Sequence, residues 1–466
     1  MAELWRLGAS ELAASIRAKR VSVREVVEAH LRRIEAANPR INAVTVVLAE
    51  RALAEARVAD EAIGRGDDLG PLHGVPMTVK ENIDLAGSPT TMGVTALAGD
   101  VPPIDAPHIA QLRAAGAIVI GRTNTPEFAM RWHTDNDLRG PTRNPWDAGR
   151  TPGGSSGGDA AALAVGLMPL GMGNDYAGSI RWPSQCCGTT GLRPSFGRVP
   201  RARTLPGAPN PPITMQLFAV HGPMARHVRD LRLALENMSG YDPRDPWCVA
   251  APLRGAEPPR PIRVALTVDP AGLGVEDSVA DGVRRAARAL ADEGYAIEEV
   301  EPPQISRAAQ LYYQLLLTSA GPPREPGIVS AGMARFGRLN AEAFAQHTTD
   351  ASDDAFAERF GIARAWSEFQ ARYPLVLGPV ATTPAFAVGS DLLNAEWSLQ
   401  WLRAIRLIVT VNLLGLPSVA VPIGVAEGLP QGIQIIASRF REDLCLDAAE
   451  AMERRVGTIT PIEAKS

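Results

Sequence analysis

Polar and apolar positions recur with a helical period near the start of the chain. Ser22 and Glu25 have the spacing of a capping box, in which each side chain satisfies a backbone N–H at the start of a helix. One face of the helix that follows carries Val27, His30, Leu31 and Ile34. The pattern predicts that residues 1–60 are an N-terminal helical segment that packs one face against the rest of the protein.

Further along the chain, short apolar runs alternate with helical periods. Strands are predicted at 74–80, 117–120, 262–268, 296–300, 375–377, 418–423 and 432–436, and helices at 108–115, 160–165, 279–290 and 443–455. The apolar stretch 407–425 contains Asn412, Gly415, Pro417 and Pro422, which predicts buried strand and loop and not a membrane span. Because strands recur from end to end, we expect an α/β fold. It would be one large domain over residues 1–466, with a mixed central β-sheet flanked by helices on both faces.

The composition narrows the class of protein. The 466 residues include 47 basic and 51 acidic side chains, for a net charge of −4, and 45% are hydrophobic, as in ordinary globular proteins. There is no basic field to attract nucleic acid, and residues 1–20 have no apolar run that would make a signal peptide or membrane anchor. The four cysteines are too few and too badly spaced for a disulfide framework or a zinc site. We therefore expect a cytoplasmic protein with no nucleic-acid, membrane or metal partner.

Lysine is rare in this chain. Of the 47 basic residues only Lys19, Lys80 and Lys465 are lysines, and the rest are arginines. Lys80 ends the apolar run 74–80, where burial favours loss of its proton, whereas a guanidinium keeps its charge. Lys80 is therefore a candidate base, and the alternative is a structural ion pair with Glu81 or Asp84.

The glycine-rich segment 151–194 admits three interpretations. A phosphate-binding loop is disfavoured because Asp159 and Ala160 stand where that motif needs lysine and a hydroxyl. The run Gly154–Gly158 fits G-x-S-x-G, but a polar turn and not a strand precedes it, and no histidine has the surroundings of a hydrolase triad. The third interpretation joins Ser155, in its glycine loop, to Lys80 and to the small-residue turn at 175–181, where Ser179 would be the nucleophile beside backbone N–H groups that hold an oxyanion.

Several ordered motifs now resemble the amidase signature family. They are GVPMTVKEN with Lys80, TPGGSSGG with Ser155, NDYAGSIRWP with Ser179, and further segments at 121–130, 222–233 and 415–436, so that nearly the whole chain is covered. The resemblance implies the amidase signature fold, with residues 74–200 as the signature core. Two residues depart from the family pattern. Ala177 replaces a usual glycine, and Tyr176 replaces a small or aliphatic residue and would narrow or reshape the acyl pocket.

The same resemblance implies a mechanism. Neutral Lys80 would accept a proton from Ser155, which takes one from Ser179 as Ser179 attacks an amide carbonyl. Backbone N–H groups of Tyr176, Ala177 and Gly178, with that of Ser179, would hold the oxyanion. Ser156, Asp175 and Arg181 would support the loops, the Gly154–Ser155 peptide would be cis, and no cofactor or metal would be needed.

The implied function is hydrolysis of a small amide to an acid and ammonia or an amine. Aromatic and apolar candidates for the pocket wall suggest an aryl or arylalkyl substrate: Met130, Trp132, Tyr176, Trp182, Tyr312, Tyr313 and Trp397. One alternative is the amidase subunit of a tRNA-dependent amidotransferase, which the unusual segment 196–216 disfavours. Another is an inactive binding protein on the same fold. The sequence leaves the oligomeric state open, a homodimer included.

Overall fold

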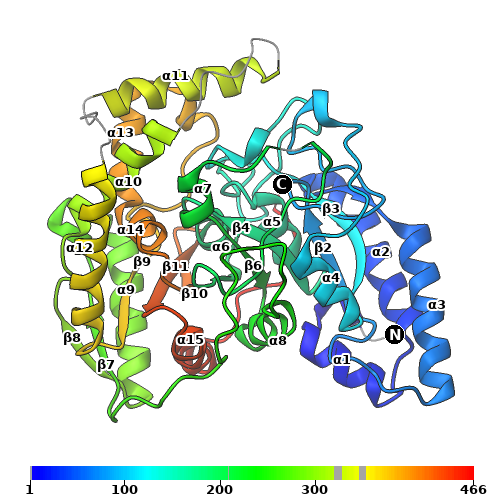
Figure 1. The fold of residues 1–466 in the computed structure, drawn as a ribbon. Coiled ribbons are helices and arrows are strands. Elements are labelled where there is room, and N and C mark those ends of the chain that lie inside the picture. Colours follow the sequence, from blue (N-terminus) through cyan, green and yellow to red (C-terminus); the bar gives the residue numbers. More distant parts are fainter. Residues whose placement is uncertain (1–2, 208, 320–327, 346–352, 466) are drawn as a thin grey trace.

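A mixed sheet of eleven strands runs through the molecule from one side to the other (Figure 1). The computed structural model describes residues 3–207, 209–319, 328–345 and 353–465. In spatial order the strands are β1 (Val44–Val47), β3 (Ile118–Thr123), β2 (Pro76–Lys80), β4 (Leu170–Asp175), β6 (Val220–Ala225), β5 (Thr190–Arg193), β10 (Ser418–Ala426), β11 (Leu429–Ala437), β9 (Leu375–Pro379), β7 (Arg263–Leu266) and β8 (Ala296–Glu299). The strand pairs β2–β3, β2–β4, β7–β8 and β7–β9 are parallel, and the remaining pairs are antiparallel.

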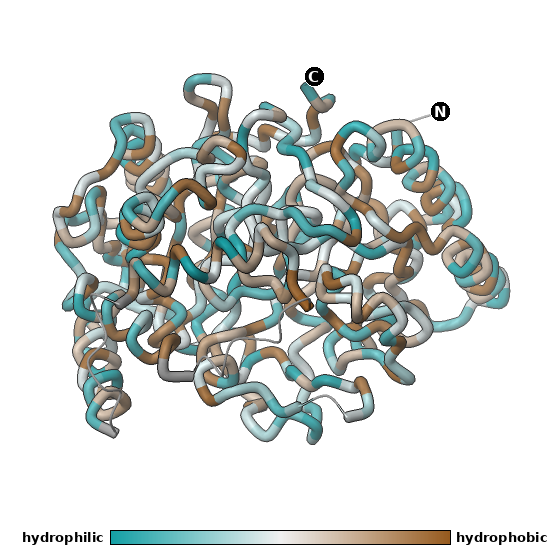
Figure 2. The backbone as a smooth tube through the Cα atoms, turned by 90° about the horizontal axis from the view of Figure 1, so that it is seen from above, coloured by the Kyte–Doolittle hydropathy of each residue, from teal (hydrophilic) through white to brown (hydrophobic). Residues whose placement is uncertain are grey.

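Helices cover both faces of this sheet, as the sequence predicts. One hydrophobic core packs under α4 (Pro107–Ala114), α8 (Val228–Met238), α9 (Asp277–Asp292) and α15 (Glu442–Val456). The other contains α2 (Val23–Ile41), α5 (Gly157–Ala164), α6 (Arg181–Cys187), α10 (Ile305–Ser319), α11 (Ala331–Ala345), α12 (Asp353–Gln370), α13 (Ala395–Ala404) and α14 (Arg406–Leu414). Three further helices are α1 (Ala9–Arg17), α3 (Ala49–Arg65) and α7 (Ile213–Phe218). Helices at the periphery alternate between hydrophobic and hydrophilic stretches, as expected where only one side of a helix is buried (Figure 2).

The centre of the fold positions the signature motifs. All eight residues of α5 are buried, and its alanines and glycines allow it to pack closely on the strands below it. Strands β2 and β4 are parallel neighbours, so their carboxyl ends lie at the same edge of the sheet. Lys80 ends β2 and Asp175 ends β4, and this edge therefore brings the lysine motif to the second serine motif.

Two elements differ from the sequence prediction. Residues 407–414, which the sequence assigns to buried strand and loop, belong to α14 (Arg406–Leu414). All nine residues of this helix are buried, so the segment has no solvent-facing side and shows no helical period. Within the predicted helical segment 1–60, β1 adds an antiparallel edge strand beside β3. The other predicted strands and helices are confirmed, with boundaries shifted by a few residues.

All four cysteines, Cys186, Cys187, Cys248 and Cys445, are free thiols and buried. Burial raises the pKa of Cys186, Cys187 and Cys445 well above the ordinary value, so these thiols stay protonated. No helix in the described part of the chain is long and apolar enough to cross a bilayer.

Candidate active site

The amine of Lys80 is enclosed by three oxygen atoms. Its Nζ lies 2.6 Å from Ser155 Oγ, 2.9 Å from Asn174 Oδ1 and 3.0 Å from Ser156 Oγ, and the side chain has no solvent exposure. A neutral amine has two N–H donors and one lone pair, and the amide oxygen of Asn174 can only accept. One N–H therefore goes to Asn174, and the amine can accept a proton from the serine hydroxyl that lies closest, Ser155.

The structural ion pair considered for Lys80 is not formed. Glu81 instead accepts hydrogen bonds from Thr45 and Thr91 and pairs with Arg139 at 2.9 Å. Asp84 accepts from the backbone and side chain of Thr204. Lys80 is thus left facing the two serines.

Burial determines the charge of this lysine. Desolvation lowers the pKa of Lys80 from 10.5 to about 7, against the attraction of Asp159 and Asp175, which raises it. At neutral pH a large fraction of the amine therefore lacks its proton and can act as a base.

The two serine segments meet beside this amine. The peptide bond Gly154–Ser155 is cis, as the family resemblance implies. The backbone N–H of Ser156 donates to the carbonyl of Ser179 at 3.1 Å, which ties the glycine loop to the second turn. Lys80 and Ser155 have no exposed surface, whereas Ser179 is 6% exposed, so of these three side chains it is the one an incoming molecule can reach.

Asp175 organises the turn that carries Ser179. Its carboxylate accepts from the N–H of Gly178 at 2.9 Å, from the guanidinium of Arg181 at 3.0 and 3.1 Å, and from the amide of Asn412 at 2.8 Å. Burial alone would raise the pKa of Asp175, but Arg181 and then Arg193 hold it well below its usual range. Asp175 is therefore a permanent anion that fixes the turn.

The backbone N–H groups that are expected to hold the oxyanion differ in the partners they have in the structure. The Gly178 N–H already donates to Asp175, so it is not free for a substrate oxygen. The N–H groups of Tyr176, Ala177 and Ser179 have no acceptor within the described residues. These three are the groups that the turn leaves open.

The replacement of a glycine by Ala177 costs this turn nothing in backbone conformation. Ala177 is not among the residues with a left-handed φ, whereas Gly178 has φ of +89°. A Cβ at Gly178 would also lie 2.6 Å from Cγ2 of Ile408, so only glycine fits there. The one glycine that the backbone requires is retained.

Three of the predicted pocket aromatics contact this turn. The indole N–H of Trp132 donates to the carbonyl of Ala177 at 3.1 Å, and the hydroxyl of Tyr312 donates to the carbonyl of Tyr176 at 2.7 Å. The ring of Tyr176 lies edge-on to Tyr312, and its own hydroxyl donates to Thr214 at 3.1 Å. Trp132, Tyr176 and Tyr312 thus combine apolar surface with hydrogen bonds that hold the turn.

The side chains of the other predicted wall residues make different contacts. That of Trp182 has no exposed surface and is packed between Phe386 and Trp401, so it belongs to the core behind the turn. Trp397 stacks on Trp401, and Tyr313 donates its hydroxyl to the carbonyl of Leu402. Met130 is 51% exposed, at the surface of the molecule. The assignment of these four residues to the pocket wall therefore stays a prediction.

Sequence reasoning missed Asn174 and Asp159 as neighbours of Lys80. Asn174 also donates its amide to Asn82 at 2.9 Å, which orients the oxygen toward the lysine. Its position just before Asp175 at the end of a strand is the available signal. From the sequence, Asp159 only argues against a phosphate-binding loop. Its position near Lys80 becomes clear only from the register of the strands.

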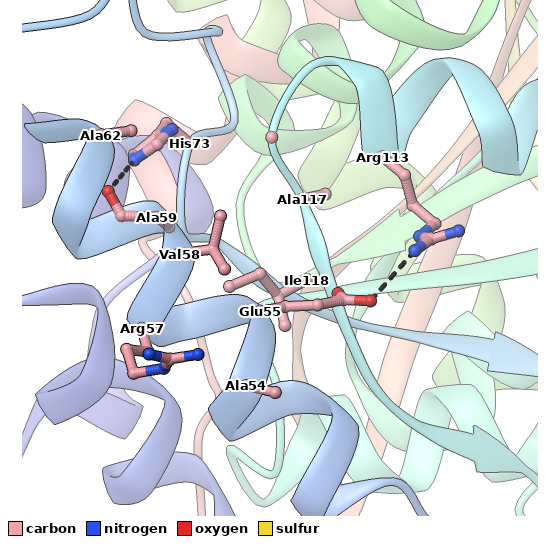
Figure 3. A pocket seen from close by; sticks show the side chains of 11 residues that line it. Ala54, Glu55, Arg57, Val58, Ala59, Ala62, His73, Arg113, Ala117 and Ile118 are labelled. Carbon is pink, nitrogen blue, oxygen red and sulfur yellow. Dashed lines mark hydrogen bonds and ion pairs between the residues drawn. The ribbon is translucent and has the colours of Figure 1, made fainter.

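A separate hollow of about 470 Å³ lies between α3 and the start of β3 (Figure 3). Its lining includes Val58, His73 and Ile118, and Arg113 pairs with Glu55 across one side. None of the residues that surround Lys80 belongs to it. Within the described residues, no group of three histidine, cysteine or acidic side chains is arranged to hold a metal ion.

Comparison with known proteins agrees with the geometry. The amidase family model matches residues 25–446. The chain is 44% identical over 469 residues to the indoleacetamide hydrolase of Bradyrhizobium diazoefficiens, covering 98% of this chain and 88% of that protein. It is 35% identical over 482 residues to one subunit of the glutamyl-tRNA(Gln) amidotransferase of Moorella thermoacetica, covering 97% of each chain.

Solved structures show the same fold. A bacterial aryl acylamidase of the amidase signature family matches with a TM-score of 0.79 and 28% identity, over 98% of this chain and 96% of that one. A 6-aminohexanoate cyclic dimer hydrolase matches with a TM-score of 0.81 and 29% identity, over 98% of both. The chain therefore belongs to the amidase signature family and is a hydrolase of amide carbon–nitrogen bonds.

Proposed function

We propose that this protein hydrolyses a small aryl or arylalkyl amide to its acid and ammonia or amine, through an acyl-enzyme on Ser179. The observation that carries the proposal is the 2.6 Å contact between Lys80 Nζ and Ser155 Oγ, in a site where burial lowers the pKa of the amine to about 7. Serine is a weak nucleophile unless a base accepts its proton. Here the base lies inside the fold, and Ser179, which alone of the three side chains has some exposed surface, is the one that meets substrate.

The proton moves along the two hydroxyls in this proposal. Ser179 attacks the amide carbonyl and gives its proton to Ser155, while Ser155 gives its own proton to Lys80. The free N–H groups of Tyr176, Ala177 and Ser179 hold the oxyanion, and loss of one such donor typically costs about 10²–10³ in kcat. The proton then returns through Ser155 to the leaving nitrogen, and water hydrolyses the acyl-enzyme.

Two kinds of support favour an aromatic substrate. Trp132, Tyr176 and Tyr312 place aromatic rings against the turn that carries Ser179, and such surface favours apolar ligands. Among the relatives are an indoleacetamide hydrolase and an aryl acylamidase, both of which act on aromatic compounds by name. We therefore place primary arylalkyl amides first among the substrates.

The amidotransferase subunit is the second candidate, because a relative of that name is 35% identical over nearly the whole chain. The identity to the indoleacetamide hydrolase is higher, at 44%. The segment 196–216 also differs from the usual sequence of that subunit. Both observations favour hydrolysis over ammonia transfer.

The test is a turnover panel that reads ammonia and free amine separately. It contains indole-3-acetamide, phenylacetamide, acetanilide, hexanamide and glutamine, with Ser179→Ala as the control. We expect kcat/KM for the arylalkyl amides to exceed that for hexanamide by at least about tenfold. Glutamine turnover that rises when a copurifying partner is added would instead support the amidotransferase. Failure of a serine-directed phosphonate to label Ser179 would support an inactive binding protein.

We also propose that the protein works in the cytoplasm as one amidase domain. Four free, buried thiols suit a reducing compartment. A homodimer remains part of this proposal and can be checked by light scattering.

A further inference from the structure

Asp159 is a buried carboxyl group that the proposed mechanism does not use. It lies in the first turn of α5 and has no solvent exposure. Its Oδ1 accepts a hydrogen bond from Thr123 Oγ1 at 2.8 Å and lies 3.5 Å from Thr78 Oγ1. Its Oδ2 is buried without a hydrogen-bond partner among the described residues. An unpaired carboxylate oxygen in the interior is costly, so such a group needs an explanation.

Strand register places this carboxyl group beside Lys80. Thr123, which holds Oδ1, is the residue of β3 that pairs with Lys80 of β2. Thr78 precedes Lys80 by two residues on the same strand, so both side chains lie on one face of the sheet. Strand β4 also packs closely against this carboxyl group, because a Cβ added at Gly171 would lie only 3.0 Å from Asp159 Oδ1.

We propose that Asp159 is a positioning residue whose carboxyl group controls how readily Lys80 gives up its proton. The inference rests on the proposed function, in which Lys80 is the base. Asp159 does not touch the substrate and acts through Lys80 alone.

Burial and mutual attraction have opposite effects on the pKa values of Asp159 and Lys80. Burial raises the pKa of Asp159 from 3.8 to about 7 and lowers the pKa of Lys80 to about 7, while their mutual attraction works against both shifts. Other ionisable groups act on them from neighbouring strands: Arg122 of β3 on Asp159, and Asp175 of β4 and His221 of β6 on Lys80. The pair therefore titrates as a coupled system close to neutral pH.

The charge of Asp159 opposes deprotonation of Lys80. An ionised Asp159 stabilises the ammonium, and a protonated Asp159 does not. The variant Asp159→Asn keeps the shape but removes the charge, so Lys80 should lose its proton at a lower pH. If Lys80 is the base, the acidic limb of the kcat/KM profile should move to lower pH by the same amount.

The scarcity of lysine makes a direct measurement practical. Protein labelled with ¹³C-lysine gives signals from Lys19, Lys80 and Lys465 only, of which Lys19 and Lys465 are exposed. The signal missing in Lys80→Met identifies Lys80, and its ¹³Cε shift is followed between pH 5 and 10. We expect Asp159→Asn to lower the midpoint of the Lys80 titration by about one pH unit or more. An unchanged or raised midpoint overturns the proposal.

A second variant and a control complete the experiment. Thr123→Val removes the hydroxyl that stabilises the carboxylate, so it should lower the Lys80 midpoint in the same direction and decides the question if Asp159→Asn does not fold. Asp230→Asn is the matched control, because Asp230 is an equally buried carboxylate that caps the start of α1 away from the site. A shift of the Lys80 midpoint in Asp230→Asn as large as in Asp159→Asn would also overturn the proposal.

The two proposals fail separately. The titration needs no substrate, so a wild-type protein inactive on every amide would refute the proposed function and leave the Lys80 titration as evidence on Asp159. An active enzyme whose Lys80 titrates identically in all variants would refute the role of Asp159 alone.

Discussion

Of the three oxygen atoms within hydrogen-bond distance of the Lys80 amine, that of Asn174 has no proton to give. It therefore fixes the direction of one lysine N–H, and the amide contact with Asn82 keeps that oxygen in place. The lone pair is left for a hydroxyl, and Ser155 is the closer of the two. At the scale of single residues, the chemistry of the site thus depends on which atoms around the amine can donate.

The three side chains of the proposed proton relay should respond unequally to truncation. Lys80→Ala and Ser179→Ala should each remove nearly all amidase activity, by at least about 10³-fold in kcat, because one removes the base and the other the nucleophile. Ser155→Ala should lose less, since a water molecule could carry the proton. Steady-state kinetics on the best amide of the panel measures this, and circular dichroism checks the fold. Substantial turnover by Ser179→Ala would show that the nucleophile is another residue.

Among the elements, the turn between β4 and α6 depends on backbone shape at one position. Gly178 needs a left-handed φ and has Ile408 against its Cα, whereas its neighbour Ala177 needs neither. The N–H of Gly178 bonds to Asp175, so the conformation of this glycine also fixes the carboxylate that holds the turn.

Gly178→Ala should therefore lower kcat by about 10²–10³, as when an oxyanion donor is misplaced, and should also reduce thermal stability. The matched variant Ala177→Gly, with the same change of one methyl group in reverse, should alter kcat by less than about tenfold. Kinetics and thermal unfolding of both variants test this. Equal losses in the two variants would contradict the argument.

The sequence predicts most elements because their faces differ in polarity. In α9, buried Val279, Val283 and Leu290 recur between exposed charges, and the period is visible. In α14 every residue from Arg406 to Leu414 is buried, so there is no period to find. The burial of Arg406 itself depends on Asp269, more than a hundred residues away, which no local pattern reveals.

Some residues of the candidate active site could likewise be predicted from the sequence, and others could not. Lys80, Ser155, Ser179 and Asp175 stand in recognisable motifs and could be predicted from them. The proximity of Asn174 and Asp159 to Lys80 could not be predicted from the sequence, because it follows from the pairing of β2 with β3 and β4. Residue type alone likewise does not give the full burial of Trp182 or the exposure of Met130.

At the scale of the whole molecule, the interior encloses several histidine side chains. Burial lowers the pKa of His30 to about 4 and that of His108 to about 3, and the pKa of His221 also falls well below its ordinary value. His108 and His221 stack on each other with ring centroids 4.3 Å apart. These rings must remain neutral for the cores to stay intact.

Acid should therefore begin to destabilise the protein at a higher pH than the one at which ordinary, exposed carboxylates titrate. Below about pH 6.5 the unfolded chain takes up protons that the native state refuses, so the free energy of unfolding should fall by about 1.4 kcal/mol per pH unit for each such histidine. For His30 the loss should continue until pH about 4, where the native ring also protonates. Urea unfolding of wild type and His30→Gln at pH 7 and 5 measures this. The variant should lose less stability than wild type over that interval, and identical losses would argue against a neutral, buried His30.

The burial of all four thiols has a practical consequence for handling the protein. Aromatic disulfide reagents should leave the thiols of the native enzyme unmodified and react only with molecules that have opened. The rate at which the thiols react at a given temperature therefore measures the rate at which the fold opens. This measurement needs no attached label and no substrate.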